Sequence, residues 1–164
     1  MNIIETINTR TSVRHYQDKA VPREVLEKLV DAGRRAPSAH NVQPWEFIIF
    51  TSDESKKKIA ALTDYGKFIE NAPACIAVYC EETKYYLEDG CATVENILLA
   101  AAGLGLGACW VAGDKKYYAQ DVNKILKVPA KYNLIALIPV GYPLRPQEAR
   151  NKRPLDNVVH WEKF

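Results

Sequence analysis

The apolar residues in the first third of the chain recur first with helical periodicity and then in short β-rich runs. Ile3, Ile4 and Ile7 fall at helical intervals, which predicts a short N-terminal helix. A second helix is expected after Val21-Pro22, because apolar positions 25, 26, 29 and 30 form one stripe. Residues 45–51 predict a strand, and Ser52-Asp53 then begins a helix whose lysines 56–58 are expected to face solvent. Residues 34–44 should form a loop.

The second half of the chain alternates strands with helices in the same way. Residues 73–80 are almost continuously apolar, which predicts a central strand covered on both faces. A long central helix follows, and we expect it to be buried because both of its sides are apolar. One side carries Val94, Ile97, Leu98, Ala101 and Gly105, and the other carries Leu99, Ala100 and Ala102. Further strands are expected at 108–112 and 134–140, a helix at 121–126, and an irregular proline-rich tail after residue 141. The pattern predicts a single domain over residues 1–164 with an α+β or three-layer fold.

Composition narrows the classes of partner. The chain has 164 residues, a formal net charge of +2, and 22 basic residues interspersed with 20 acidic ones, so a nucleic-acid partner is not expected. Residues 97–113 carry no charge, but the stretch is shorter than the roughly 20 residues of a membrane span and is rich in glycine. A membrane partner is therefore not expected.

The cysteines and the N-terminus indicate a cytoplasmic protein. Cys75, Cys80, Cys91 and Cys109 form no Cys-x-x-Cys pair, which favours reduced thiols over disulfides or a metal site. The first residues show no basic region followed by an apolar core, so a secretory signal is not expected.

The glycine-rich segment Gly103-Leu104-Gly105-Leu106-Gly107-Ala108 formally matches a dinucleotide-binding pattern. Such a pattern functions when it follows a strand and opens a helix, whereas this segment follows a helix and leads into a strand. A helix C-terminus with left-handed glycines is the better interpretation. Gly113, which lacks a Cβ, should let the backbone of residues 111–113 approach another group closely.

Two polar segments carry the candidate chemistry. Arg10-Thr11-Ser12-Val13-Arg14 offers two guanidinium groups and two hydroxyls to a phosphate, although the arginines could equally be solvated surface charges. In the loop of residues 37–45, the amides of Asn41 and Gln43 can donate to and accept from a heterocycle, or they can simply shape turns. His15, His40 and His160 lie in no hydrolase motif, so no catalytic side chain is assigned.

Four ordered blocks of this sequence resemble the nitroreductase family of flavoproteins. They are Arg10-Thr11-Ser12-Val13-Arg14; Ala36-Pro37-Ser38 with Asn41-x-Gln43-Pro44-Trp45-x-Phe47; Glu95 to Ala101 continuing through Leu104-Gly105-Leu106-Gly107-x-Cys109-Trp110; and Val140-Gly141-Tyr142-Pro143 with Arg153-Pro154-Leu155. The resemblance implies FMN bound at the interface of an intertwined homodimer. It also implies a central, mostly antiparallel or mixed sheet flanked by helices, with the C-terminal tail reaching over the partner subunit.

The resemblance also implies roles for individual residues. Arg10, Thr11, Ser12 and Arg14 would hold the phosphate and ribityl chain, together with Arg153 and with Lys152 or Arg150 as a second basic residue. Pro37, Ser38, Asn41 and Gln43 of the neighbouring subunit would line the isoalloxazine, and the Ala112-Gly113 backbone would approach flavin N5.

The implied activity is that of an FMN-dependent oxidoreductase. NADH or NADPH would deliver a hydride to flavin N5 and leave, and a small acceptor such as a nitroaromatic or quinone would then be reduced in a ping-pong cycle. Two alternatives stay open. One is an FMN-binding redox sensor or carrier without turnover, and the other is a relative that fragments flavin or removes halogens.

Overall fold

The computed structural model describes residues 2–146, 148 and 150–164. Its helices are α1 (Ile3–Thr9), α2 (Arg23–Gly33), α3 (Asp53–Leu62), α4 (Tyr86–Gly103) and α5 (Ala119–Leu126), with short 3-10 turns η1 (Ala39–Asn41), η2 (Lys67–Asn71) and η3 (Leu155–Asn157). The strands are β1 (Trp45–Phe50), β2 (Ala74–Glu81), β3 (Gly107–Ala108), β4 (Val111–Ala112) and β5 (Tyr132–Gly141). The sheet has the order β1-β2-β5-β3 with β4 also on β5, and all of these pairs are antiparallel.

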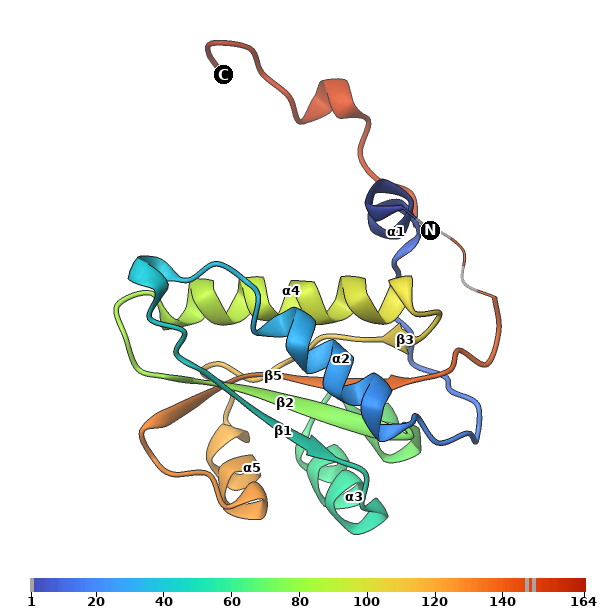
Figure 1. The fold of residues 1–164 in the computed structure, drawn as a ribbon, viewed down its shortest axis with the longest axis vertical. Coiled ribbons are helices and arrows are strands. Elements are labelled where there is room, and N and C mark those ends of the chain that lie inside the picture. Colours follow the sequence, from blue (N-terminus) through green and yellow to red (C-terminus); the bar gives the residue numbers. More distant parts are fainter. Residues whose placement is uncertain (1, 147, 149) are drawn as a thin grey trace.

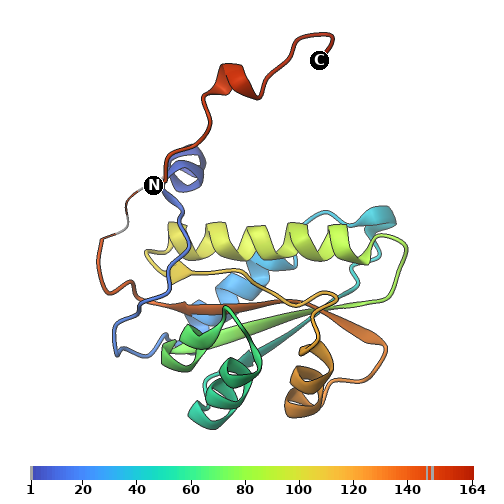
Figure 2. The same ribbon diagram turned by 180° about the vertical axis from the view of Figure 1, so that it is seen from behind.

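The sheet lies between two layers of helices (Figures 1 and 2). Successive residues of β2 point to opposite faces: Ile76 and Val78 pack under α2 and α4, whereas Ala77 and Tyr79 pack against α3 and α5. All of β2 except Glu81 is buried, as expected for a central strand covered on both sides. The predicted α+β three-layer fold with a mostly antiparallel central sheet is confirmed.

The outer face of α4 is less covered than its sequence suggests. Val94 and Ile97 are fully buried, but Leu99, Ala100 and Ala102 are only partly buried. In Figure 1 the layer above α4 consists of α1 and the C-terminal tail, which project away from it. The predicted central helix is therefore buried on the side that faces the sheet, while its apolar outer side stays partly exposed within one chain.

The strand expected at 108–112 forms as two short strands in one continuous register. Gly107 pairs with Gly141 and Ala112 with Ala136, and Cys109 N donates to the Pro139 carbonyl at 3.3 Å in between. The segment from Gly107 to Gly113 thus runs along the outer edge of β5 from Gly141 to Ile135.

Of the three glycines between 103 and 107, only Gly105 has a left-handed backbone, with φ of 73°. Gly107 is required for a different reason, because a Cβ there would lie 2.6 Å from the Val13 side chain. The expectation of left-handed glycines is thus met at one position, and close packing explains another.

Lys56 corrects the expectation of a fully solvated lysine face on α3. Its side chain is only 7% exposed, with Nζ donating to the Ala72 carbonyl at 2.8 Å and pairing with Asp53 at 3.0 Å. The flexible stem of a lysine can pack against apolar groups while its ammonium finds polar partners. Lys56 therefore ties α3 to the segment that enters β2.

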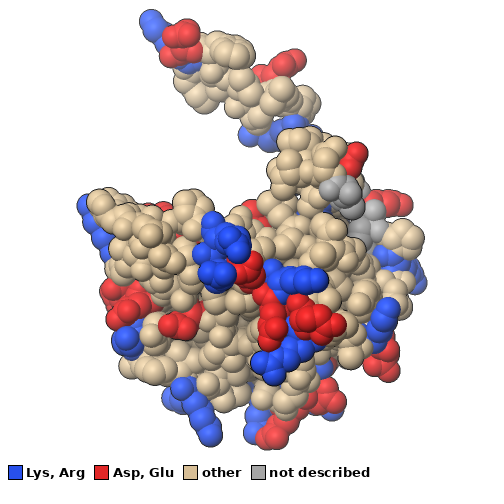
Figure 3. Space-filling view, viewed as in Figure 1, with Lys and Arg blue, Asp and Glu red and all other residues tan. Residues whose placement is uncertain are grey.

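Charges on the α2 face alternate in sign (Figure 3). Arg23 pairs with Glu27, and Arg34 and Arg35 both pair with Asp31.

Within the described part of the chain, no helix is long and apolar enough to cross a membrane. Cys75, Cys80, Cys91 and Cys109 are all free thiols.

Candidate functional site

The basic segment after α1 is fixed to the edge of the sheet. Ser12 forms a parallel bridge with Ala108, and Val13 N donates to the Ala108 carbonyl at 3.0 Å. Buried Tyr16 holds the same segment from below, since its hydroxyl donates toward the carbonyls of Val13 at 2.7 Å and Pro139 at 3.1 Å. The side chains of residues 10–14 are therefore presented from an anchored backbone.

Two neighbouring clefts open beside this segment and share Ser12, Arg14 and Arg150. One has a volume of about 580 Å³ and is also lined by Arg10, Thr11, Glu95 and Lys152. The other has a volume of about 470 Å³ and is also lined by His15 and Arg145. The sequence separates these cations by more than a hundred residues, and the fold brings them to one place.

The two arginines of the segment are held by different neighbours. Arg10 Nε lies 3.7 Å from a carboxylate oxygen of Glu95, and the Arg14 guanidinium lies 5.8 Å from the centre of the Phe68 ring. Burial raises the pKa of the Cys109 thiol, and Arg14, Ser12 and Arg10 partly offset that rise. The bridge between Ser12 and Ala108 places these cationic groups beside the outer edge of the sheet.

The backbone at Ala112 forms the other end of the same edge. Ala112 lies opposite Ala136, between pairs of residues that exchange hydrogen bonds, so its N–H and C=O point away from β5. The Ala112 carbonyl accepts a hydrogen bond from the Tyr118 hydroxyl. The Ala112 N–H therefore faces the open side of the edge strand.

Gly113 has a structural role that its sequence context did not suggest. Its N–H donates to the Ile135 carbonyl at 2.9 Å, so that group is already used within the sheet. A Cβ at this position would lie 2.5 Å from Leu134 Cγ and 3.0 Å from the Leu134 carbonyl oxygen. Glycine is thus required here by the packing of β5, and of the two residues only Ala112 offers a backbone donor to a ligand.

The basic segment and the Ala112 backbone lie along a single edge. Ser12 sits beside Ala108, and Ala112 follows four residues later, which corresponds to about 13 Å along an extended strand. An anion site and a backbone donor at this separation suit a ligand with a phosphate at one end and a heterocycle at the other.

The amide loop before β1 is tightly folded. His40, Asn41 and Gln43 have left-handed backbones, with φ of 53°, 57° and 54°. The Ser38 hydroxyl accepts from Gln43 N at 3.0 Å, and Asp89 accepts from Ala39 N at 3.0 Å through one carboxylate oxygen. Left-handed residues other than glycine cost free energy and often gather at ligand sites. The turn-forming role expected as one alternative is present for Ser38, while exposed Asn41 makes no side-chain hydrogen bond within the described residues.

Within one chain this loop and the basic segment lie at opposite edges of the sheet. The loop leads into β1, whereas residues 10–14 lie beside β3, and three strand spacings of about 4.8 Å separate β1 from β4. Pro37, Ser38, Asn41 and Gln43 are therefore not brought to the Ala112 edge of their own chain.

Arg153 also lies apart from the basic clefts. Its guanidinium donates to the Asn157 carbonyl at 2.7 Å in the projecting tail, and the basic tail residues that line the clefts are Arg145, Arg150 and Lys152. Tyr118 and Arg145 were not anticipated from the sequence. A tyrosine before a helix and an arginine in a proline-rich tail carry no local signal for such positions.

Comparison with solved structures first defines the class of fold. The chain superposes on a putative NADH dehydrogenase/NAD(P)H nitroreductase from Parabacteroides distasonis with a TM-score of 0.95 and 32% identity, covering 100% of both chains. A putative nitroreductase from Desulfovibrio desulfuricans, solved in complex with FMN, matches with a TM-score of 0.88 and 31% identity, covering 100% of this chain and 98% of that one.

Sequence comparison then gives the family. The family model described as putative TM nitroreductase matches residues 2–164. A putative NADH dehydrogenase/NAD(P)H nitroreductase from Methanothermobacter thermautotrophicus is 34% identical over 173 residues, covering 100% of this chain and 88% of the relative. The chain belongs to the nitroreductase family and is an oxidoreductase of the nitroreductase type.

Proposed function

We propose that the protein is an FMN-dependent NAD(P)H oxidoreductase that reduces a small acceptor such as a nitroaromatic or a quinone. The observation that carries this proposal is the shared strand edge, which holds a cluster of cations beside Ala108 and an outward-facing N–H at Ala112. The FMN complex of the relative from Desulfovibrio desulfuricans supports the choice of cofactor.

The cationic clefts fit the phosphate end of FMN. Arg10 and Arg14 offer fork-shaped donors, Ser12 offers a hydroxyl, and Arg150 and Lys152 add positive charge from the tail. Hydrogen bonds between charged groups contribute about 1.5–3 kcal/mol each. Two or three such bonds are enough to hold a dianionic phosphate in the presence of water.

The Ala112 edge fits the ring end. Bound FMN supplies hydride acceptance and donation at N5. The Ala112 N–H can donate to a ring nitrogen from the fixed geometry of an antiparallel pair, and Tyr118 holds the neighbouring carbonyl in place. This chain thus provides orientation and hydrogen bonding at this edge.

A second subunit completes the site in this proposal. Ile3, Ile4 and Ile7 of α1 are each at least half exposed, and Trp161 in the tail is 86% exposed, so large apolar side chains are available for a partner. In a homodimer with two-fold symmetry, residues 37–43 of one subunit would cover the flavin held by residues 10–14 of the other.

The first test is the visible spectrum of the purified protein before and after anaerobic addition of NADPH and then NADH. Flavin bands that bleach and return with a quinone or nitroaromatic support the proposal. A protein that stays colourless after FMN is supplied contradicts it. Bands that resist both donors would instead indicate a sensor or carrier.

Variants then test the phosphate end. Arg14→Gln should raise the Kd for FMN by about tenfold or more, because one charge-assisted interaction is removed. Arg23→Gln, on the exposed surface of α2, is the matched control and should leave FMN affinity unchanged.

Mixing two defective variants tests the shared site. An Arg14→Gln chain and an Asn41→Ala chain, mixed and allowed to exchange subunits, should regain about a quarter of the wild-type sites, because half of the dimers are mixed and one of their two sites is intact. No recovery after proven subunit exchange would show that both residues act within the same chain.

A further inference from the structure

A separate cleft of about 660 Å³ begins where the proposed flavin edge ends. Gly113 and Asp114 line one end of it, and α5, the turns on either side of that helix, Tyr86 and the first residues of β5 line the rest. Tyr118, immediately before α5, donates to the Ala112 carbonyl, so α5 starts beside the edge and runs away from it. The cleft therefore extends outward from the place where a hydride donor would meet the flavin.

Four lysines and one aspartate line this cleft, namely Lys115, Lys116, Lys124, Lys127 and Asp114. Lys115 pairs with Asp114 at 3.9 Å, and Lys124 pairs with Asp121 at 2.7 Å. Lys116 and Lys127 form no ion pair among the described residues. These two cations are thus available to an anionic ligand.

The two available cations stand at opposite ends of the cleft. Lys116 N donates to the Gly113 carbonyl at 3.2 Å, which places this residue at the flavin end. Lys127 follows the last residue of α5, a helix of eight residues and hence about 12 Å long. The arrangement suits a ligand that carries phosphate groups at two separate points.

Lys127 occupies a position at which glycine is usual. It ends α5 with φ of 56° and ψ of 41°, a left-handed conformation in which a side chain is unfavourable. A lysine here therefore keeps its charge over the cleft at a cost to the local backbone.

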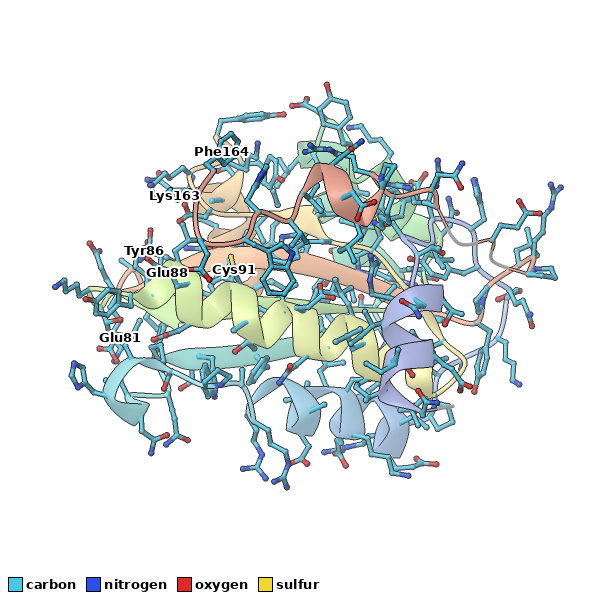
Figure 4. All side chains as sticks on the ribbon, turned by 90° about the horizontal axis from the view of Figure 1, so that it is seen from above. Glu81, Tyr86, Glu88, Cys91, Lys163 and Phe164 are labelled. Carbon is cyan, nitrogen blue, oxygen red and sulfur yellow. The ribbon has the colours of Figure 1, made fainter. Side chains whose placement is uncertain are left out.

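The walls between the two cations suit a nucleoside. Ala119, Val128 and Leu134 contribute apolar surface to the cleft, and Asn123 also lines it. Asn123 Oδ1 is buried and has no hydrogen-bond partner among the residues that the structure describes. Once the side chain turns into the cleft, this oxygen would accept from a ribose hydroxyl or an exocyclic amino group of a base. Figure 4 shows Tyr86 on the first turn of α4, and its hydroxyl donates to Asp114 at 2.9 Å, which holds the acidic side chain at the flavin end of the cleft.

We propose that this cleft is the subsite for the phosphorylated adenosine half of NADPH. In this assignment Lys116 contacts the pyrophosphate next to the nicotinamide, and Lys127 contacts the 2′-phosphate that distinguishes NADPH from NADH. The assignment rests on the proposed function, because it takes the Ala112 edge as the place of hydride transfer. It predicts that the protein prefers NADPH.

Direct binding tests the subsite without turnover. In calorimetric titrations of the purified protein, adenosine 2′,5′-bisphosphate should bind at least tenfold more tightly than ADP. Lys127→Gly should remove this difference and should leave the thermal midpoint equal or higher, because glycine relieves the left-handed position. Lys28→Gln, an exposed lysine on the opposite helical layer, is the charge-matched control and should change neither affinity.

Kinetics then separate the two lysines. Lys127→Gly should raise KM for NADPH about tenfold with little change for NADH, whereas Lys116→Gln should raise KM for both donors. Equal affinity for adenosine 2′,5′-bisphosphate and ADP, no binding of either, or the same KM values in Lys127→Gly would each overturn the assignment. Failure of the proposed function would give a different result, namely no FMN binding or no flavin reduction by either donor. The calorimetric titrations measure ligand binding at this cleft independently of FMN binding and of flavin reduction.

Discussion

Replacing Gly113 with alanine distinguishes two explanations of this residue. If glycine is present to let a cofactor approach, the substitution should weaken FMN binding and leave the apoprotein as stable as before. The structure predicts the opposite, because the new Cβ would lie 2.5 Å from Leu134 Cγ and 3.0 Å from its carbonyl oxygen. Leu134 is 2% exposed, so its side chain is held by the residues packed around it.

The expected size follows from this overlap. Forcing an additional methyl group into a packed interior costs about 1–3 kcal/mol. For a chain of this length, each kcal/mol lowers the melting temperature by about 2–4 °C. We therefore expect Gly113→Ala to lower the melting temperature of the FMN-free protein by about 2–12 °C.

A double-mutant cycle identifies the clash as the cause. Leu134→Ala alone should cost about 2–5 kcal/mol, because it removes a buried side chain. The combination of Gly113→Ala and Leu134→Ala should cost at least about 1 kcal/mol less than the sum of the two single effects, since the clash with Cγ disappears. Urea unfolding of the apoprotein measures all four species. An additive cycle, or a Gly113→Ala apoprotein as stable as the wild type, would refute the packing explanation.

Three further predictions address other parts of the molecule. Lys56→Met should lower the free energy of unfolding by about 1–2 kcal/mol in urea titrations, because the buried Ala72 carbonyl loses its donor; an unchanged midpoint would contradict this. Burial and the hydrogen bond to Asp114 raise the pKa of Tyr86 to about 12, so this tyrosine ionises at lower pH in the unfolded chain than in the folded one. The free energy of unfolding should therefore fall between about pH 10 and 12, and it should fall less steeply in Tyr86→Phe. Asp89→Ala should speed FMN release about tenfold in stopped-flow measurements, because the backbone N–H of Ala39 loses its acceptor. Asp89→Asn keeps an acceptor and should have a smaller effect. Equal release rates for the two variants would argue against a role for Asp89 in holding the loop.

Elements whose pattern is local were predicted close to their actual bounds. The apolar run at 73–80 is β2, and the stripe after Pro22 is α2. The strand expected at 134–140 extends to Tyr132–Gly141, and the helix expected at 121–126 begins two residues earlier, at Ala119. These signals come from side-chain periodicity and capping, which act over a few residues.

Positions set by distant neighbours were not predictable in this way. Lys56 is surrounded by lysines in sequence, and only the packing of α3 against the segment before β2 buries it. The sequence around Gly113 suggests only that its backbone can approach another group. The packing reason becomes apparent once the structure places Leu134, twenty-one residues further along the chain, in contact with this position. The expected role of Arg153 at the phosphate remains a prediction, since its own contact is with Asn157.

The sequence by itself determined which segments could carry the chemistry. Two arginines flanking two hydroxyls, and a loop that contains amide side chains, can be recognised from the residue types alone. Only the tertiary structure decided their arrangement. It placed residues 10–14 and Ala112 on one edge of the sheet and the loop of residues 37–43 on the other. It also gathered lysines from the ends of α5 around a single cleft. The physical reason is that strand order and register depend on burying both faces of the sheet at once, a condition that no local stretch of sequence contains.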